Sequence, residues 1–188
     1  MIGELPRSLE VGGVTYDIRT DFRDVLRVIE AFSDPNLEDG EKAYICLYII
    51  YKDFEALPED AYEDAYRAAL MFIDQNSDID GDRKKSPVIM DWEQDAGIMF
   101  PAINKVAGFE TRSAEYIHWW TFIGYYMEIS EGVFSNVLSI RAKKAKGKKL
   151  EKWEREFWAA NKDICALKTR LSDEEQAAKN ALIAMLDG

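Results

Sequence analysis

The chain has 188 residues, of which 47% are hydrophobic and 31% charged, and this composition excludes an intrinsically disordered protein. Its 35 acidic and 24 basic residues give a net charge of −11, which opposes general binding to nucleic acid or to an anionic membrane because both repel an acidic surface. The N-terminus lacks a basic segment followed by an apolar one, and no apolar stretch is long enough to cross a bilayer. We therefore expect a cytoplasmic protein without a signal peptide.

The first predicted element is a β-hairpin. Residues 7–11 and 14–19 flank the pair Gly12-Gly13, and glycines supply the positive φ angles that a tight turn needs. Because a two-stranded hairpin is marginal alone in water, we expect it to lie on helices or to pair its edge with another chain.

Three amphipathic helices are predicted next. Apolar residues recur at helical spacing over 21–32 and over 39–54. A third helix is expected to begin at Pro58, since proline suits the first helical position. The polar stretch 76–87 then predicts a linker between an N-terminal part (1–75) and a C-terminal part (88–188), which form either two domains or one continuous domain.

The C-terminal part is also predicted to be helical. A helix over 91–106 should be kinked or divided by Pro101 and stopped by Gly108. Ser113 is expected to cap a helix that reaches Met127 and is apolar nearly all round, which is typical of a central, buried helix. A shorter helix follows Gly132.

The last part of the chain has a heptad pattern. Apolar residues alternate at spacings of three and four: Leu150, Trp153, Phe157, Ala160, Ile164, Leu167 and Leu171. This pattern fits either an amphipathic helix pair that closes on its own domain or a seam that docks a partner chain. Ser172 and Glu175 predict a capping box for one final helix. The predicted fold class is mainly α, a helical bundle with a short N-terminal β-hairpin.

A basic segment with Gly147 inside it precedes and overlaps the heptads. Between positions 141 and 155 stand eight basic residues against two acids: Arg141, Lys143, Lys144, Lys146, Lys148, Lys149, Lys152 and Arg155. Three interpretations of this basic segment are open: a solvated helix junction, a docking site for an acidic protein surface, or a nucleic-acid site. The acidic surface could be the N-terminal half of another copy of the chain. Nucleic acid is disfavoured because Trp153 and Phe157 have core spacing rather than that of a stacking platform. The candidate partner-binding residues are Arg141, Lys143, Lys144, Lys148, Lys149, Leu150, Trp153, Phe157, Ile164 and Leu167.

No catalytic or metal site and no cofactor is predicted. His118 is the single histidine and no nucleophile motif accompanies it, so we expect a structural or interface role. Cys46 and Cys165 lie in apolar stretches and are interpreted as reduced core residues.

Two acidic patterns were candidates for chemistry. Carboxylate pairs one helical turn apart are Asp91/Asp95 and Glu59/Glu63. Acids near helix starts have an ordinary explanation in the helix dipole, so neither pair is expected to be catalytic. Part of a calcium loop is matched by Asn76, Asp78, Asp80 and Gly81. Pro87 stands where such a loop needs its bidentate Glu, which favours a solvated linker.

Several segments together resemble one bacteriophage family. They are the Leu5-Pro6 hairpin and the helix after it, the stretch from Asp91-Trp92 to Val106, His118-Trp119-Trp120-Thr121-Phe122, and Ile140 to Leu150 with Trp153-Glu154. They are similar to the "gp-fifteen" family of siphophages and prophages of Gram-positive hosts, and the resemblance covers nearly the whole chain.

The resemblance implies a function. Members are typically encoded between the major tail protein and the tape-measure protein, which implies a tail-assembly chaperone in the host-cell cytoplasm. Such a chaperone would coat the tape-measure protein, recruit tail-tube subunits, self-associate and be absent from the finished virion. The family offers no catalytic residues to carry over. The alternatives are a structural tail or connector component of the virion and, from another class, a nucleic-acid-associated protein that uses the Lys-rich segment.

Overall fold

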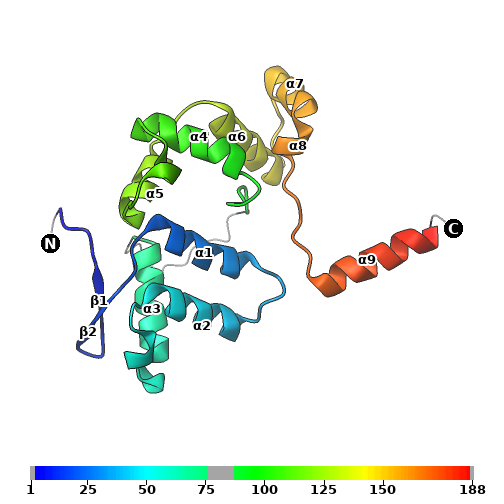
Figure 1. Cartoon of the computed structure of the whole chain (residues 1–188). Helices are drawn as coiled ribbons and strands as arrows, with labels where there is room; N and C mark the ends of the chain where they lie inside the picture. The colour runs from blue at the N-terminus through cyan, green and yellow to red at the C-terminus, as the bar shows by residue number, and fades with distance from the viewer. Residues whose placement is uncertain (1–2, 76–86, 187–188) are drawn as a thin grey trace. The chain divides into compact units, whose positions relative to one another are not determined.

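The computed structural model describes residues 3–75 and 87–186, and in these residues the chain is mainly helical, as predicted. They contain nine α-helices and one two-stranded sheet (Figure 1). None of these helices is both long enough and apolar enough to cross a membrane. The calcium-like stretch and all of the predicted linker except Pro87 lie outside the described residues. The division of the chain predicted at this linker therefore stays a prediction.

The chain forms two compact units, each assembled from separate stretches of sequence. The first unit comprises the N-terminal residues to Pro6, Thr20–Arg23 and Leu70–Lys168. The second unit comprises Arg7–Arg19, Asp24–Ala69 and the C-terminal residues from Thr169.

The predicted hairpin is confirmed and belongs to the second unit. β1 (Ser8–Val11) and β2 (Val14–Asp17) pair antiparallel around Gly12 and Gly13, whose φ angles are 58° and 79°. The chain then pairs Ile18 with Tyr51, just beyond α2 (Asp39–Ile50). The Arg19 guanidinium donates to the carbonyls of Ile49 and Tyr51 at 2.9 and 2.8 Å, so it satisfies acceptors that a helix end leaves unpaired. The segment that follows the hairpin is therefore fastened to the end of α2, while pairing of the hairpin edge with another chain stays a prediction.

The helix predicted over 39–54 ends earlier, at Ile50. Tyr51 is extended because it pairs with Ile18, and a 3₁₀ turn, Phe54–Ala56, follows. The buried Tyr51 hydroxyl donates to the Ala65 carbonyl of α3 (Tyr62–Ile73) at 2.8 Å. Pro58 directly precedes a 3₁₀ turn that leads into α3, close to the expected start. Buried apolar residues form the core of this unit: Val25 and Val28 of α1 (Phe22–Ser33), Cys46, Leu47, Ile50, Ala65 and Ala69.

In the first unit, α4 (Ala96–Ala107) begins later than predicted. The Asp91 carboxylate accepts hydrogen bonds from the backbone N–H groups of Glu93 and Gln94, which makes a capped turn ahead of the helix. α4 continues through Pro101 without division and ends at Gly108, whose φ of 80° confirms the predicted stop.

α5 (Trp119–Met127) begins at Trp119 and not at Ser113, which lies in a 3₁₀ turn. The cap is His118, whose Nδ1 accepts the backbone N–H of Trp120 at 3.0 Å. One face of α5 is buried through Trp119 and Phe122, whereas Met127 is exposed, so the helix is not buried all round. The prediction of a buried helix therefore holds for one face of α5 only.

The heptad stretch is not one continuous helix. It forms α7 (Lys152–Ala160) and the single turn α8 (Lys162–Cys165), and it leaves the helical path before α9 (Asp173–Leu186). The predicted capping box of the last helix is confirmed, since the Ser172 N–H donates to the Glu175 carboxylate and the Glu175 N–H donates to the Ser172 hydroxyl.

Candidate functional site

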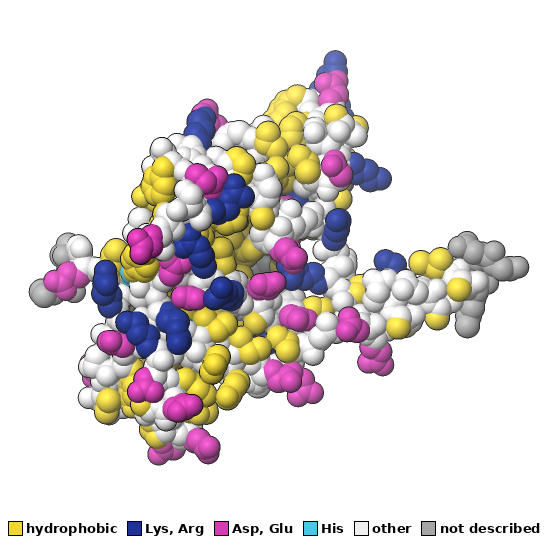
Figure 2. Space-filling model, in the orientation of Figure 1, with side chains coloured by type: hydrophobic (Ala, Val, Ile, Leu, Met, Phe, Trp, Pro, Cys, Tyr) yellow, Lys and Arg dark blue, Asp and Glu magenta, His cyan; other side chains and the backbone are white. Residues whose placement is uncertain are grey.

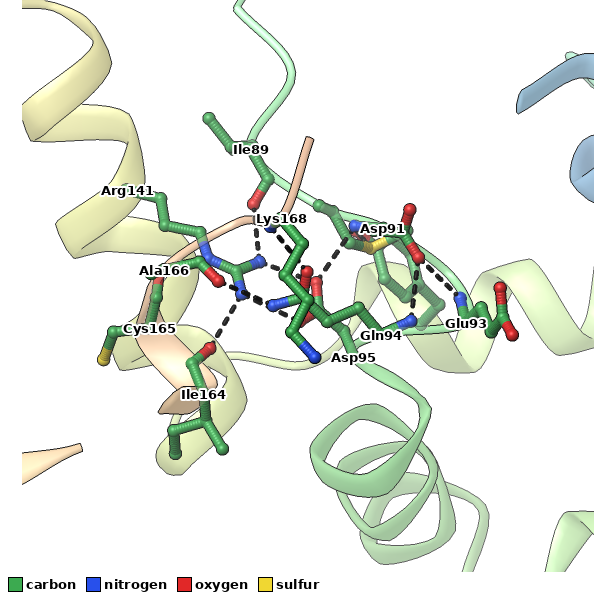
Figure 3. A network of polar contacts seen from close by, with 12 residues as sticks. Ile89, Asp91, Glu93, Gln94, Asp95, Arg141, Ile164, Cys165, Ala166 and Lys168 are labelled. Carbon is green, nitrogen blue, oxygen red and sulfur yellow. Dashed lines mark hydrogen bonds and ion pairs between the residues drawn. The ribbon is translucent and has the colours of Figure 1, made fainter. Parts of the chain in front are cut away.

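Arg141, the first residue of the basic segment, is buried in the first unit. It lies on α6 (Val133–Ala145), and its guanidinium forms a two-pronged ion pair with Asp95 at 2.6 and 2.9 Å (Figure 3). The side chains of the two residues are only 4% and 1% exposed. This pair fixes α6 to the start of α4.

The remaining N–H groups of Arg141 donate to backbone carbonyls. Its partners are Ile89 at 3.1 Å, Ile164 at 2.8 Å and Cys165 at 2.8 Å (Figure 3). An arginine has five N–H donors, and here all five are used. Because burial and pairing occupy the whole guanidinium, Arg141 is a structural tie and not part of an exposed surface, which corrects its place among the candidate partner-binding residues.

Gln94 makes a second tie to the same segment. Its side-chain amide donates to the Ala166 carbonyl at 2.7 Å and accepts the Lys168 backbone N–H at 2.9 Å (Figure 3). Together with Arg141, it captures the backbone of residues 164–168. These contacts explain why the heptad pattern does not continue as a helix, since Ala166 is extended and the carbonyls of residues 164–166 bond to side chains.

Two further lysines of the basic segment have partners on α7. Lys143 donates to the buried Glu154 carboxylate at 2.6 Å, and this hydrogen bond lowers the pKa of Glu154. The same carboxylate accepts the Glu151 backbone N–H at 2.7 Å, which completes a capping box. The Lys144 ammonium lies 3.6 Å from the centroid of the Trp158 ring. These contacts hold α6 against α7.

The turn between the two helices projects the other cations into solvent. Gly147, with φ 64°, ends α6 in a Schellman motif, in which the Lys148 N–H donates to the Lys143 carbonyl and the Gly147 N–H to the Lys144 carbonyl. The exposed residues at this turn and on α7 define what we call the basic surface: Lys146, Lys148, Lys149, Lys152, Arg155 and Trp153. Trp153 is 50% exposed, which is high for so large an apolar side chain.

The other candidate residues are not brought together in one seam. Leu150, Phe157, Ile164 and Leu167 are all half-buried on separate elements. The heptad residues therefore do not lie along one continuous helix, and their role in partner binding stays a prediction.

α9 is exposed along its described side chains, from Asp173 to residue 184. It carries large apolar groups in solvent, with Leu182 and Ile183 59% and 46% exposed. Its start is tied to the second unit by the Asp173 N–H, which donates to the Asn36 side chain at 2.8 Å. An isolated helix of this length is marginal in water.

His118 has a structural role in the first unit. Because its Nδ1 accepts from Trp120, the proton stands on Nε2, which donates to the Pro6 carbonyl at 2.9 Å. The indole N–H groups of Trp119 and Trp120 donate to the carbonyls of Ile73 and Phe72, both at 2.8 Å, and so satisfy the last turn of α3. Sequence reasoning placed these tryptophans inside but missed their hydrogen bonds.

The remaining candidates for chemistry are ordinary structural or surface residues. Asp95 pairs with Arg141, and the exposed Glu63 lies 3.5 Å from Arg67. Burial raises the pKa of the Cys46 thiol to about 12 and also raises that of Cys165. Within residues 3–75 and 87–186, no group of three or more metal-ligating side chains comes together.

One cluster was not anticipated from the sequence. Tyr44, Tyr48, Phe54 and Tyr62 bring four rings together on the second unit, around Phe54. The signal was present, since Tyr44 and Tyr48 are one helical turn apart and outside the apolar face of α2.

Comparison with known proteins identifies a family. The model of a protein family described as "Bacteriophage Gp15 protein" matches residues 1–167. No curated protein and no solved structure matches the chain. α9 lies beyond the matched residues.

Proposed function

The chain belongs to the Bacteriophage Gp15 protein family, and from this premise we propose that it is a non-catalytic tail-assembly chaperone. It binds the tape-measure protein and tail-tube subunits while the tail is built. Self-association is part of the same proposal.

The basic surface is the observation that carries this proposal. Lys146, Lys148 and Lys149 are exposed and make no ion pair within the described residues, although the chain as a whole has a net charge of −11. Concentrated positive charge on an acidic protein favours an acidic partner surface and sets the orientation of docking. Trp153, half-exposed beside them in sequence, supplies an aromatic anchor of the kind that dominates binding energy in protein interfaces.

The internal contacts of the first unit support the proposal because they hold this surface in one shape. Lys143 with Glu154, and Lys144 with Trp158, fix α6 to α7 on either side of the turn. A surface that is rigid before binding loses little conformational entropy when a client docks. The exposed cations therefore form a preorganised group.

α9 offers a second contact for a helical client. Its apolar residues are exposed near its end, and its first turn carries Asp173, Glu174 and Glu175. A helix that exposes apolar side chains can pair with a helix or groove of another protein.

Co-expression with the tape-measure protein encoded beside it tests the proposal. We expect the tagged chain to retain the tape-measure protein in a pull-down, and Lys148→Glu/Lys149→Glu to weaken that retention. The matched control is Lys162→Glu/Lys168→Glu, which makes the same change in charge at two exposed lysines of the same unit. Equal retention by both double variants would remove the basic surface from the binding site, and no retention by the unaltered chain would contradict the proposal.

Mass spectrometry of purified virions separates a chaperone from a structural component. A chaperone is expected in lysates that contain assembling tails and absent from finished particles. A stoichiometric amount in the particle would instead assign the chain to the tail or connector.

A further inference from the structure

The cluster of four aromatic rings in the second unit is partly open to solvent. The Phe54 ring centroid lies 5.1 Å from that of Tyr44, 5.8 Å from Tyr48 and 5.5 Å from Tyr62. Tyr44 and Tyr48 stack on each other at 6.4 Å, and their side chains are 52% and 61% exposed. Neither of these two hydroxyl groups makes a hydrogen bond within the described residues. A core role accounts for the inner rings but not for the two outer ones.

Acidic residues surround this cluster in sequence. Residues 38–64 contain nine acids against two bases, Lys42 and Lys52. Four exposed acids close to the rings in sequence make no ion pair within the described residues: Asp53, Glu55, Glu59 and Asp60. Glu63 and Asp64, which follow Tyr62, pair with Arg67. Figure 2 shows hydrophobic side chains where α2 lies in Figure 1, with both acidic and basic side chains around them.

The combination of ring faces and carboxylates selects for cations. The face of an aromatic ring is the negative end of its quadrupole, and an ammonium or guanidinium group within about 6 Å of the centroid is attracted to it. The carboxylates add a charge attraction that draws the cation to the surface. The same carboxylates repel phosphate groups, so a nucleic acid or an anionic membrane does not fit here.

We propose that this aromatic–acidic surface, made of Tyr44, Tyr48, Phe54, Tyr62, Asp53, Glu55, Glu59 and Asp60, binds a segment of a partner protein that is rich in Lys and Arg. Cationic side chains of the partner lie over the Tyr44 and Tyr48 rings and pair with the carboxylates beside Phe54. The inference is independent of the proposed function, since it uses other residues and the opposite charge from the basic surface.

Fluorescence anisotropy of a labelled peptide of alternating Lys and Ala residues, titrated with the full chain, tests the proposal. We expect binding at low ionic strength that weakens with added salt, and no binding of the same peptide with Gln in place of Lys. Tyr44→Ala/Tyr48→Ala should weaken binding roughly tenfold, since two exposed cation–π contacts are lost. Tyr44→Phe/Tyr48→Phe keeps the rings and should bind as the unaltered chain does.

A charge-matched pair of variants tests the carboxylates. Asp53→Asn/Glu55→Gln/Asp60→Asn should weaken binding, whereas Glu115→Gln/Glu128→Gln/Asp163→Asn, which removes three exposed acids elsewhere, should not. Circular dichroism checks that each variant is folded, and alanine at the two tyrosines suits a helix. Equal binding of the Gln peptide, or equal loss in both triple variants, would overturn the proposal, because either result means unspecific attraction.

Discussion

Replacing Arg141 by Met should strongly destabilise the first unit. The substitution keeps the length of the side chain and removes its charge. The Asp95 carboxylate is only 1% exposed and keeps the Asp91 backbone N–H as a donor. The carbonyls that Arg141 served each lose a donor: those of Ile89, Ile164 and Cys165. Breaking a buried ion pair by removing one partner costs about 3–5 kcal/mol, because the other charge is left uncompensated.

Urea unfolding followed by tryptophan fluorescence and far-UV circular dichroism measures this loss. Lys148→Met removes a cation from the exposed turn and should change the free energy of unfolding by no more than about 0.5 kcal/mol. Arg141→Met/Asp95→Leu removes both buried charges and should be less destabilised than Arg141→Met alone. If Arg141→Met costs less than about 1 kcal/mol, or if the double variant is the less stable of the two, the structural role given to the ion pair is refuted.

Three further outcomes follow from local geometry. His118→Ala should lower stability by about 1–2 kcal/mol through the lost cap, and His118→Asn should recover part of it in thermal unfolding, since Asn is a good N-cap; equal losses would contradict the capping role. The Cys46 thiol, with its pKa raised to about 12, should react slowly with a disulfide reagent at pH 8 and rapidly in urea, and fast labelling of the folded chain would place it outside the core. Gly147→Ala should lower the free energy of unfolding by about 1–2 kcal/mol because the φ angle of Gly147 is positive. Gly97→Ala, inside α4, should raise it by about 0.5–1 kcal/mol. In both cases the added Cβ meets no atom within 4 Å, so the difference measured by urea unfolding reports backbone conformation alone.

Local rules predicted much of the fold. Gly12-Gly13, Gly108 and the Ser172/Glu175 box each specify a structure within a few residues, and each was found as expected. The errors occur where a distant residue decides the local structure. α2 ends at Ile50 because Tyr51 pairs with Ile18, more than thirty residues earlier in the chain.

The candidate site was harder to predict for the same reason. The basic segment looked uniform in sequence, but its residues differ in whether the rest of the fold supplies an acidic partner. Arg141 is buried because Asp95 reaches it from another helix, whereas Lys148 and Lys149 follow the Gly147 turn into solvent. The regular heptad spacing did not reveal that Arg141 and Gln94 bind the backbone of residues 164–168.

The dissociation constant of the complex with the tape-measure protein tests most directly whether the chain works by binding another protein through its basic surface. It should be measured with the purified full chain, with Lys148→Glu/Lys149→Glu and with Lys162→Glu/Lys168→Glu, all at one ionic strength. We predict a complex that the first double variant weakens about tenfold and the second leaves unchanged. A dissociation constant equal in all three proteins, or no complex with the unaltered chain, would contradict this account.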